Sequence, residues 1–294
     1  MCCSLWYSFA GFVTQNDYLS LDGQIQHKLA YIFDYIPADK HLILIGHSIG
    51  CYMILEMLSA GTKYSLAQSG NKVKKCYLLF PTIERLAQSP KGQFFTPLLK
   101  YFRWIVPLFT LPMLFLPHRV KQFLIGRYFG LGQVPQCAVE ATTKLLSPTA
   151  CRNCLYLANI EMHSVRELDA ETIFKHLEQL CFYYGANDAW CPTEYHDSMK
   201  RLFPSGEIYL CSNGIQHAFV LNSSDHMAVI VSDWIESIWL VHRREASVVD
   251  GLWAVVSRSH DSLHWCGTVH DKLNLVQYHL HPVNIVDTNY SCTE

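Results

Sequence analysis

Short apolar runs and amphipathic stretches alternate along most of this chain. The apolar runs are rich in branched and aromatic residues, which is typical of strands buried in a sheet, and they lie at 42–45, 76–80, 180–184 and 207–211. The stretches between and after them have a helical spacing of apolar positions, at 24–36, 48–59, 193–203 and 224–242. This alternation predicts an α/β fold with a mostly parallel sheet flanked by helices.

The first apolar run leads directly into Gly46-His47-Ser48-Ile49-Gly50, a G-x-S-x-G sequence. Such a string occurs by chance in about one in ten chains of this length, so its context decides its meaning. Here a strand, the string and an amphipathic helix follow in the order of a nucleophile elbow. We therefore interpret Ser48 as a nucleophile and the backbone N–H of Ile49 as a donor to an oxyanion. His47 occupies the free position of the motif and is interpreted as a packing residue.

The partners of a nucleophilic serine are expected in the order acid and then histidine, each in a loop that follows a strand. Asp188 follows the run at 180–184, and His217 follows the run at 207–211 and a turn at 212–214. The alternative for Asp188 is an ordinary turn residue. The alternative for His217 is a structural role, because the chain has 15 histidines. The three together would form a Ser-His-Asp triad, in which imidazole takes the hydroxyl proton and the carboxylate orients the imidazole.

Five short strings stand out in this chain, at 46–50, 79–85, 182–185, 188–192 and 217–220. Together they resemble the motifs of the lipid droplet-associated hydrolase family, which lies within the α/β-hydrolases. The similarity extends from about Tyr18 to about Met227. In the acid loop, Ala189 stands where the family pattern has proline, a change that alters the stiffness of the loop and leaves the carboxylate in place. The motifs are Gly46–Gly50, Leu79–Arg85, Phe182–Gly185, Asp188–Pro192 and His217–Val220.

This resemblance implies a triad of Ser48, Asp188 and His217 and a serine esterase or lipase type of reaction without a cofactor. It implies neutral lipid esters as substrates, such as cholesteryl esters or acylglycerols, and a role in lipid storage or turnover. The implied location is the surface of lipid droplets and the cytosolic face of the endoplasmic reticulum membrane.

The composition is that of a globular protein with little charge. Charged residues make up 16% and the net charge is −2, which does not favour a nucleic-acid partner. The N-terminal residues show no secretory signal, so the 12 cysteines are expected to be reduced thiols. Cys151 and Cys154 form a C-x-x-C pair without further ligands at zinc spacing, and we predict no metal site. No particular protein partner is indicated.

Residues 85–139 contain no Asp or Glu but carry seven Lys and Arg residues. In their centre, 104–117 is uncharged and is interrupted by three prolines, which argues against a membrane-spanning helix. The pattern favours a cap over the active site that also dips into a lipid monolayer, with its cations at the head groups. The alternative is a cap whose apolar face belongs to the core. The predicted lipid-contact residues are Trp104, Leu108, Phe109, Leu111, Leu114 and Phe115.

The two ends of the chain depart from the family pattern. Only 47 residues precede Ser48, and they lack the glycine-rich string that supplies the second oxyanion donor. We therefore expect an N-terminally truncated sheet in which the first strands and the second donor are missing, with residues 4–13 as one strand. The expected organisation is a hydrolase domain at 1–243, with a cap insertion at about 86–165. Residues 244–294 are expected to be a poorly ordered tail outside the family.

Three functions are compatible with these features. The first is a serine hydrolase of neutral lipid esters. The second is a lipid-surface protein of the same fold whose activity has been impaired and which serves in targeting or as a scaffold. The third, a soluble esterase of non-lipid substrates, conflicts with the absence of acidic residues from the cap.

Overall fold

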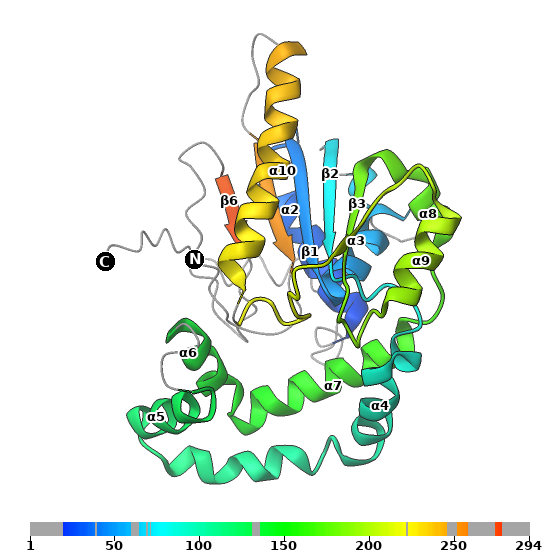
Figure 1. The fold of residues 1–294 in the computed structure, drawn as a ribbon. Coiled ribbons are helices and arrows are strands. Elements are labelled where there is room, and N and C mark those ends of the chain that lie inside the picture. Colours follow the sequence, from blue (N-terminus) through cyan, green and yellow to red (C-terminus); the bar gives the residue numbers. More distant parts are fainter. Residues whose placement is uncertain are drawn as a thin grey trace.

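A computed structural model describes residues 20–38, 40–59, 65–68, 70, 72–130, 136–221, 223–245, 252–257 and 274–277. Its centre is a parallel sheet of six strands in the order β4-β3-β2-β1-β5-β6, with helices around it (Figure 1). The predicted α/β fold is confirmed. The strands are β1 (His41–His47), β2 (Lys72–Leu79), β3 (Leu180–Gly185), β4 (Glu207–Cys211), β5 (Leu252–Ser257) and β6 (Asn274–Gln277).

The run of apolar residues at 42–45 forms the interior strand β1. Its five central residues are buried, because strands pair with it on both sides and helices cover the sheet. Strand β3 is buried over its whole length, whereas the outer strand β4 is buried only at Ile208 and Cys211. The continuous apolar pattern of β1 and β3 is thus explained by burial on both faces.

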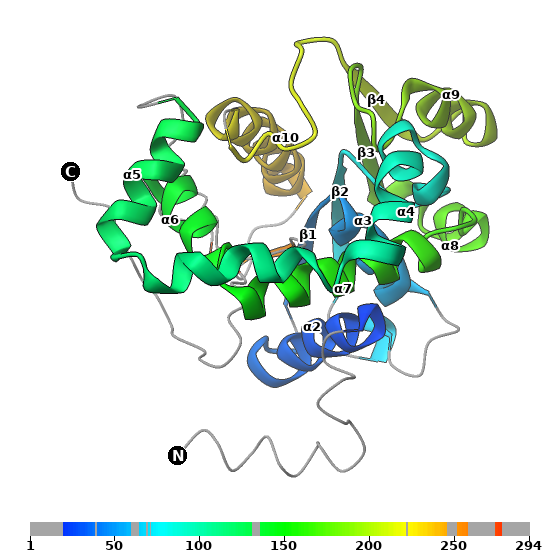
Figure 2. The same cartoon turned by 90° about the horizontal axis from the view of Figure 1, so that it is seen from below.

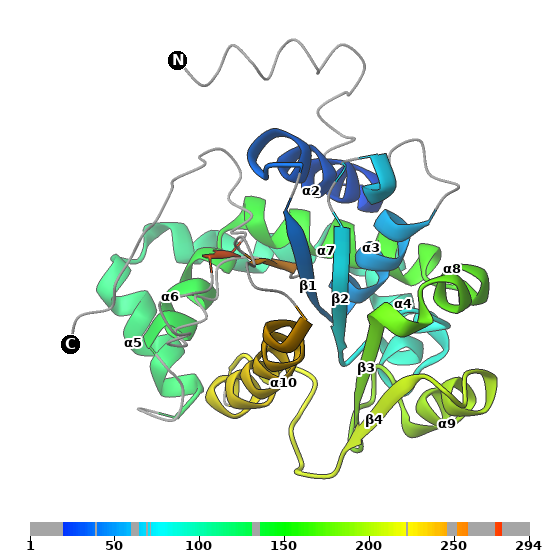
Figure 3. The same ribbon diagram turned by 90° about the horizontal axis from the view of Figure 1, so that it is seen from above.

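Helices cover the two faces of the sheet. Viewed from above, α3 (Ile49–Leu58), α8 (Ala170–Lys175) and α9 (Thr193–Leu202) lie on one face, and α10 (Ser224–Glu245) lies on the other (Figure 3). On the α10 side, the Trp234 ring stacks on Tyr77 of β2 and Tyr209 of β4, with ring centroids 5.3 and 6.2 Å away. The same ring meets Tyr183 of β3 edge-on at 5.3 Å. These contacts hold α10 across three neighbouring strands.

The helix expected before the first strand is present as α2 (Leu21–Tyr35). Ser20 caps it, because the serine Oγ accepts a hydrogen bond from the Gly23 N–H at 2.9 Å. Leu29 and Ile32 are buried in the core, as their spacing predicts, and α2 packs against α3 and α7.

The described chain between β2 and β3 consists of helices and the short turns and loops that join them, without a strand. We call residues 86–165 the cap insertion. It gathers at one end of the sheet, at the bottom of Figure 1, and Figure 2 shows α7 extending across that end. The insertion contains η3 (Leu86–Gln88), α4 (Pro90–Phe102), the 3₁₀ helix η4 (Val106–Phe115), α5 (His118–Tyr128), α6 (Gln136–Leu145) and α7 (Pro148–Ser164).

The two ends of the cap insertion are joined to each other. The Arg85 N–H donates to the Arg166 carbonyl at 2.7 Å, and the Leu86 N–H donates to the Val165 carbonyl at 3.1 Å. The chain therefore leaves the sheet domain and returns to it at one place.

In the described ranges, no single helix is long and apolar enough to cross a membrane. Helices α4 and η4 reach that length and composition only as a pair, and a bend of 74° separates them. Pro107 and Pro112 lie within η4, where they favour the tighter 3₁₀ winding over an α-helix.

The remaining expectations concern segments near the two ends of the chain. The strand expected at 4–13 lies outside the described residues, and within them no strand precedes β1. In the region predicted to be a tail, the apolar pieces form β5 and β6, which extend the sheet beyond β1. The helix expected to end near residue 242 ends at Glu245.

Candidate active site

Ser48 lies at a sharp turn between β1 and α3. Its backbone has φ 55° and ψ −123°, a strained conformation for a residue other than glycine. The Ser48 N–H donates to the Leu79 carbonyl at 3.0 Å, which ties the turn to the end of β2. A Cβ on Gly46 would lie 2.9 Å from the backbone nitrogen of Cys51, so this position requires glycine. The elbow predicted from the sequence is thus present in the backbone.

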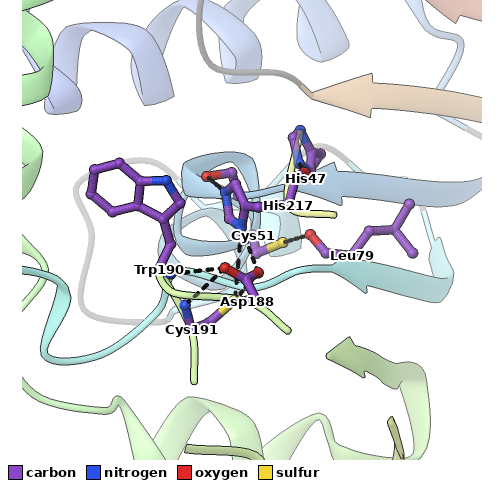
Figure 4. A network of polar contacts seen from close by, with 8 residues as sticks. His47, Cys51, Leu79, Asp188, Trp190, Cys191 and His217 are labelled. Carbon is purple, nitrogen blue, oxygen red and sulfur yellow. Dashed lines mark hydrogen bonds and ion pairs between the residues drawn. The ribbon is translucent and has the colours of Figure 1, made fainter. Parts of the chain in front are cut away.

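The structure brings Ser48, His217 and Asp188 together. His217 Nε2 lies 2.8 Å from Ser48 Oγ, and His217 Nδ1 lies 2.6 Å from Asp188 Oδ2. The three residues follow β1, β4 and β3, at the carboxyl ends of these parallel strands. Figure 4 shows His217 beside Asp188. Both distances lie in the range for a serine that a neighbouring imidazole can deprotonate.

The Asp188 carboxylate is fully buried and is held by several donors. Its Oδ1 accepts from the Trp190 N–H at 2.8 Å, and its Oδ2 faces His217. Burial by itself would raise the pKa of Asp188, but these contacts and the charge of His217 hold that pKa below its ordinary value. The carboxylate is therefore ionised when the site works near neutral pH.

Cys191 is a member of the site that the sequence did not reveal. Its thiol donates to Asp188 Oδ2 at 2.8 Å and lies 3.9 Å from His217 Nδ1. Burial, together with the charge of Asp188, raises the pKa of this thiol well above its ordinary value, so it is present as S–H. The only signal in the sequence was that Cys191 follows Asp188 by three residues. The contact between the thiol and the carboxylate depends on how the acid loop folds back, which the sequence does not show.

The ligand atoms of Asp188, Cys191 and His217 also lie within 4.8 Å of one another, close enough to surround a metal ion. The hydrogen bonds among these same atoms explain their proximity, since each is a donor or acceptor within the triad. We therefore assign the cluster to the triad.

His47 also takes part in the site, through the backbone. Its Nε2 lies 2.8 Å from the carbonyl oxygen of His217, and its ring packs on Phe219 with centroids 4.6 Å apart. The sequence predicted a packing residue here, and the structure adds a hydrogen bond that fixes the loop carrying His217.

Ile49 is the first residue of α3. The first N–H groups of a helix have no acceptor within the helix, so the Ile49 N–H is available to an oxyanion beside Ser48. The second donor was expected to be missing. The residues before α2, where a second donor would be sought, lie outside the described residues, so the absence of this donor stays a prediction.

The predicted lipid-contact residues lie on the surface of the cap insertion. Phe115 is 87% exposed and Phe109 is 76% exposed, which is unusual for side chains of this size. The other four are exposed as well: Trp104, Leu108, Leu111 and Leu114.

The chain is also similar to a known protein family. The family model described as lipid-droplet associated hydrolase matches residues 10–220. The chain belongs to this family. The matched stretch contains Ser48, Asp188 and His217, and it ends before α10.

Relatives with this family name occur in distant organisms. The lipid droplet-associated hydrolase of Gallus gallus is 41% identical over 223 residues, which cover 75% of this chain and 66% of the relative. That of Homo sapiens is 42% identical over 222 residues, 74% of this chain and 65% of the relative. That of Dictyostelium discoideum is 28% identical over 248 residues, 75% of this chain and 72% of the relative. The chain thus spans just under two thirds of the length of the first two.

Proposed function

We propose that this protein is a serine ester hydrolase that acts on neutral lipid esters at the surface of lipid droplets. The observation that carries the proposal is the relay from Ser48 Oγ through His217 to Asp188, with distances of 2.8 and 2.6 Å. A buried carboxylate, an imidazole and a hydroxyl at the start of a helix suit acyl transfer.

In the proposed reaction, Ser48 Oγ attacks the ester carbonyl while its proton passes to His217 Nε2. The carbonyl oxygen becomes an oxyanion, which the Ile49 N–H stabilises. The intermediate then collapses, the alcohol leaves with the proton from His217, and the acyl group stays on Ser48. Water, deprotonated by His217, attacks the acyl-enzyme and releases the fatty acid. Asp188 keeps the imidazole in the tautomer with its proton on Nδ1.

The substrate class and the location rest on the family and on the cap insertion. Relatives at about 41% identity are named lipid droplet-associated hydrolases. The exposed aromatic and aliphatic residues of η4 suit insertion into a phospholipid monolayer, while Lys100, Arg103 and Arg119 lie near the head groups. Cholesteryl esters and acylglycerols are the proposed substrates. The cytosolic face of the endoplasmic reticulum, where such a monolayer begins, is the proposed second location.

The test uses the purified chain and a fluorophosphonate probe, which labels only an activated serine. We expect labelling of the wild type and none of Ser48→Ala. Hydrolysis of a short-chain nitrophenyl ester should show the same dependence on Ser48. Emulsions of cholesteryl oleate and of triolein, assayed side by side, would then identify the preferred lipid ester. A folded wild type that neither labels nor hydrolyses would instead favour the impaired lipid-surface protein.

A further inference from the structure

Trp190 lies in the acid loop, between the triad and the cap insertion. Its backbone N–H donates to Asp188 Oδ1 at 2.8 Å, and its ring centroid lies 6.3 Å from that of His217. Figure 4 shows the indole projecting away from the loop on the side opposite Leu79. The residue thus contacts the acid of the triad with its backbone and approaches the histidine with its side chain.

Helix α4 of the cap insertion holds this loop at two points. The Phe95 ring stacks on the Trp190 ring, with centroids 5.5 Å apart and planes inclined by 22°. The Lys91 N–H donates to the carbonyl of Ala189 at 3.0 Å. The Lys91 ammonium also lies 5.8 Å from the centre of the indole. Lys91 and Phe95 of α4 therefore restrain Ala189 and Trp190, the two residues that follow Asp188.

The first turn of α4 is itself fixed to the base of the cap insertion. Ser89 Oγ donates to the Leu86 carbonyl at 2.8 Å and accepts from the Gly92 N–H at 3.0 Å. A Cβ on Gly92 would collide with the Leu86 carbonyl, so only glycine allows this approach. A displacement of α4 would consequently be passed to the acid loop.

The surface of α4 beside Phe95 is apolar and exposed, and we call it the outer face of α4. Leu98 and Phe102 follow Phe95 by three and seven residues and therefore lie on the same side of the helix. Phe94 and Tyr101 are 69% and 57% exposed, and Leu98 and Phe102 are exposed beside them. The same short helix thus contacts the acid loop through Lys91 and Phe95 and presents apolar side chains to solvent, or to a lipid surface, beside these contacts.

We propose that Trp190 is a positioning residue through which α4 sets the alignment of Asp188 with His217, so that lipid binding to the outer face of α4 raises turnover. This inference rests on the proposed hydrolase function. Phe95 and Lys91 hold the indole and the carbonyl of Ala189, and the Trp190 N–H holds the carboxylate. When a lipid surface binds α4 and restricts its motion, the acid loop is restricted as well. A larger fraction of the molecules then has Asp188 aligned with His217.

The first experiment measures kcat and KM for a soluble short-chain ester, per active site titrated with fluorophosphonate. Trp190→Ala should lower kcat about 10-fold and leave KM within about 2-fold, and Trp190→Phe should recover most of the loss because a ring still stacks on Phe95. Phe95→Ala should lower kcat in the same direction. Phe174→Ala, which removes an exposed ring from α8, is the matched control and should behave as wild type.

The second experiment adds phosphatidylcholine–phosphatidylserine vesicles to the same soluble ester. The wild type should gain kcat on binding them, whereas Phe95→Ala should bind them without the gain. An equal gain in both proteins, or a rise in KM alone for Trp190→Ala, would overturn the inference while leaving the hydrolase function intact. Loss of labelling in the wild type itself would overturn the hydrolase function instead.

Discussion

The triad and the outer surface of the cap insertion distribute polar and apolar groups in opposite ways. At the triad, a charged carboxylate is completely buried and is surrounded by donors from His217, Trp190 and Cys191. On the cap insertion, Phe115 and other large apolar side chains face outward, with no acidic residue between 85 and 139. The buried charge is satisfied within the protein. The exposed apolar surface is in contact with solvent, and the proposed function places it against a lipid surface.

The largest effect is expected from variants that remove one member of the relay from Ser48 through His217 to Asp188. Ser48→Ala and Asp188→Asn should each lower kcat for a soluble ester by about 10⁴-fold, because the hydroxyl or the correct histidine tautomer is lost. Circular dichroism and thermal unfolding would show whether the variants are folded. Retention of more than a tenth of the wild-type rate by a folded variant would contradict the assignment of the triad.

The corresponding change on the cap insertion is the replacement of Leu108, Leu111, Leu114 and Leu116 by serine. Full burial of a leucine gives roughly 1.5–3 kcal/mol, so burial of a third of each side chain predicts about 30-fold to 1,000-fold weaker binding. Flotation with artificial lipid droplets measures the bound fraction.

Exposed apolar residues outside the cap insertion provide the control for this variant. Leu202→Ser on α9 and Val229→Ser on α10 should leave droplet binding unchanged. If all of these changes weakened binding equally, the cap insertion would not be the lipid-binding surface, and the contrast between the two regions would fail.

Substitutions of glycine distinguish close packing at the elbow from open surface. Gly46→Ala should lower the free energy of unfolding by about 1–3 kcal/mol, because the added methyl group meets Ile54 and the backbone of Cys51. Gly214→Ala faces open space and should cost about 1 kcal/mol through its left-handed conformation alone. Urea unfolding of both variants gives the comparison. A larger loss for Gly214→Ala would be the contrary result.

The smallest expected effect concerns the thiol beside the acid. Cys191→Ala removes one of the donors to Asp188 Oδ2, so the pKa of Asp188 should rise toward its ordinary value and kcat should fall about 3-fold to 10-fold. Cys191→Ser keeps a donor and should lose less. Cys76→Ala, a buried thiol of β2, is the control. Equal losses for all three variants would indicate packing rather than hydrogen bonding.

Local sequence was sufficient to locate strands β1 to β4 and the loops that carry the candidate triad, because both depend on neighbours along the chain. Ser48, Asp188 and His217 were identifiable since each follows a recognisable apolar strand. The contacts of Cys191 and Trp190 were not, because they depend on how the acid loop folds back and on α4, which is distant in sequence. The apolar character of 252–256 was visible, but its pairing with β1 was not encoded in any local pattern.

The meeting of the two backbone ends at Arg85–Leu86 and Val165–Arg166 makes the cap insertion an exchangeable module. A segment that begins and ends at hydrogen-bonded neighbours can be lengthened, shortened or replaced by a tight turn without moving β2 or β3. Changes in the cap insertion that keep the contacts of Lys91 and Phe95 with the acid loop can therefore alter its outer surface without altering the alignment of Asp188 with His217. For protein engineering, the same junction is the natural place to graft the cap of another hydrolase.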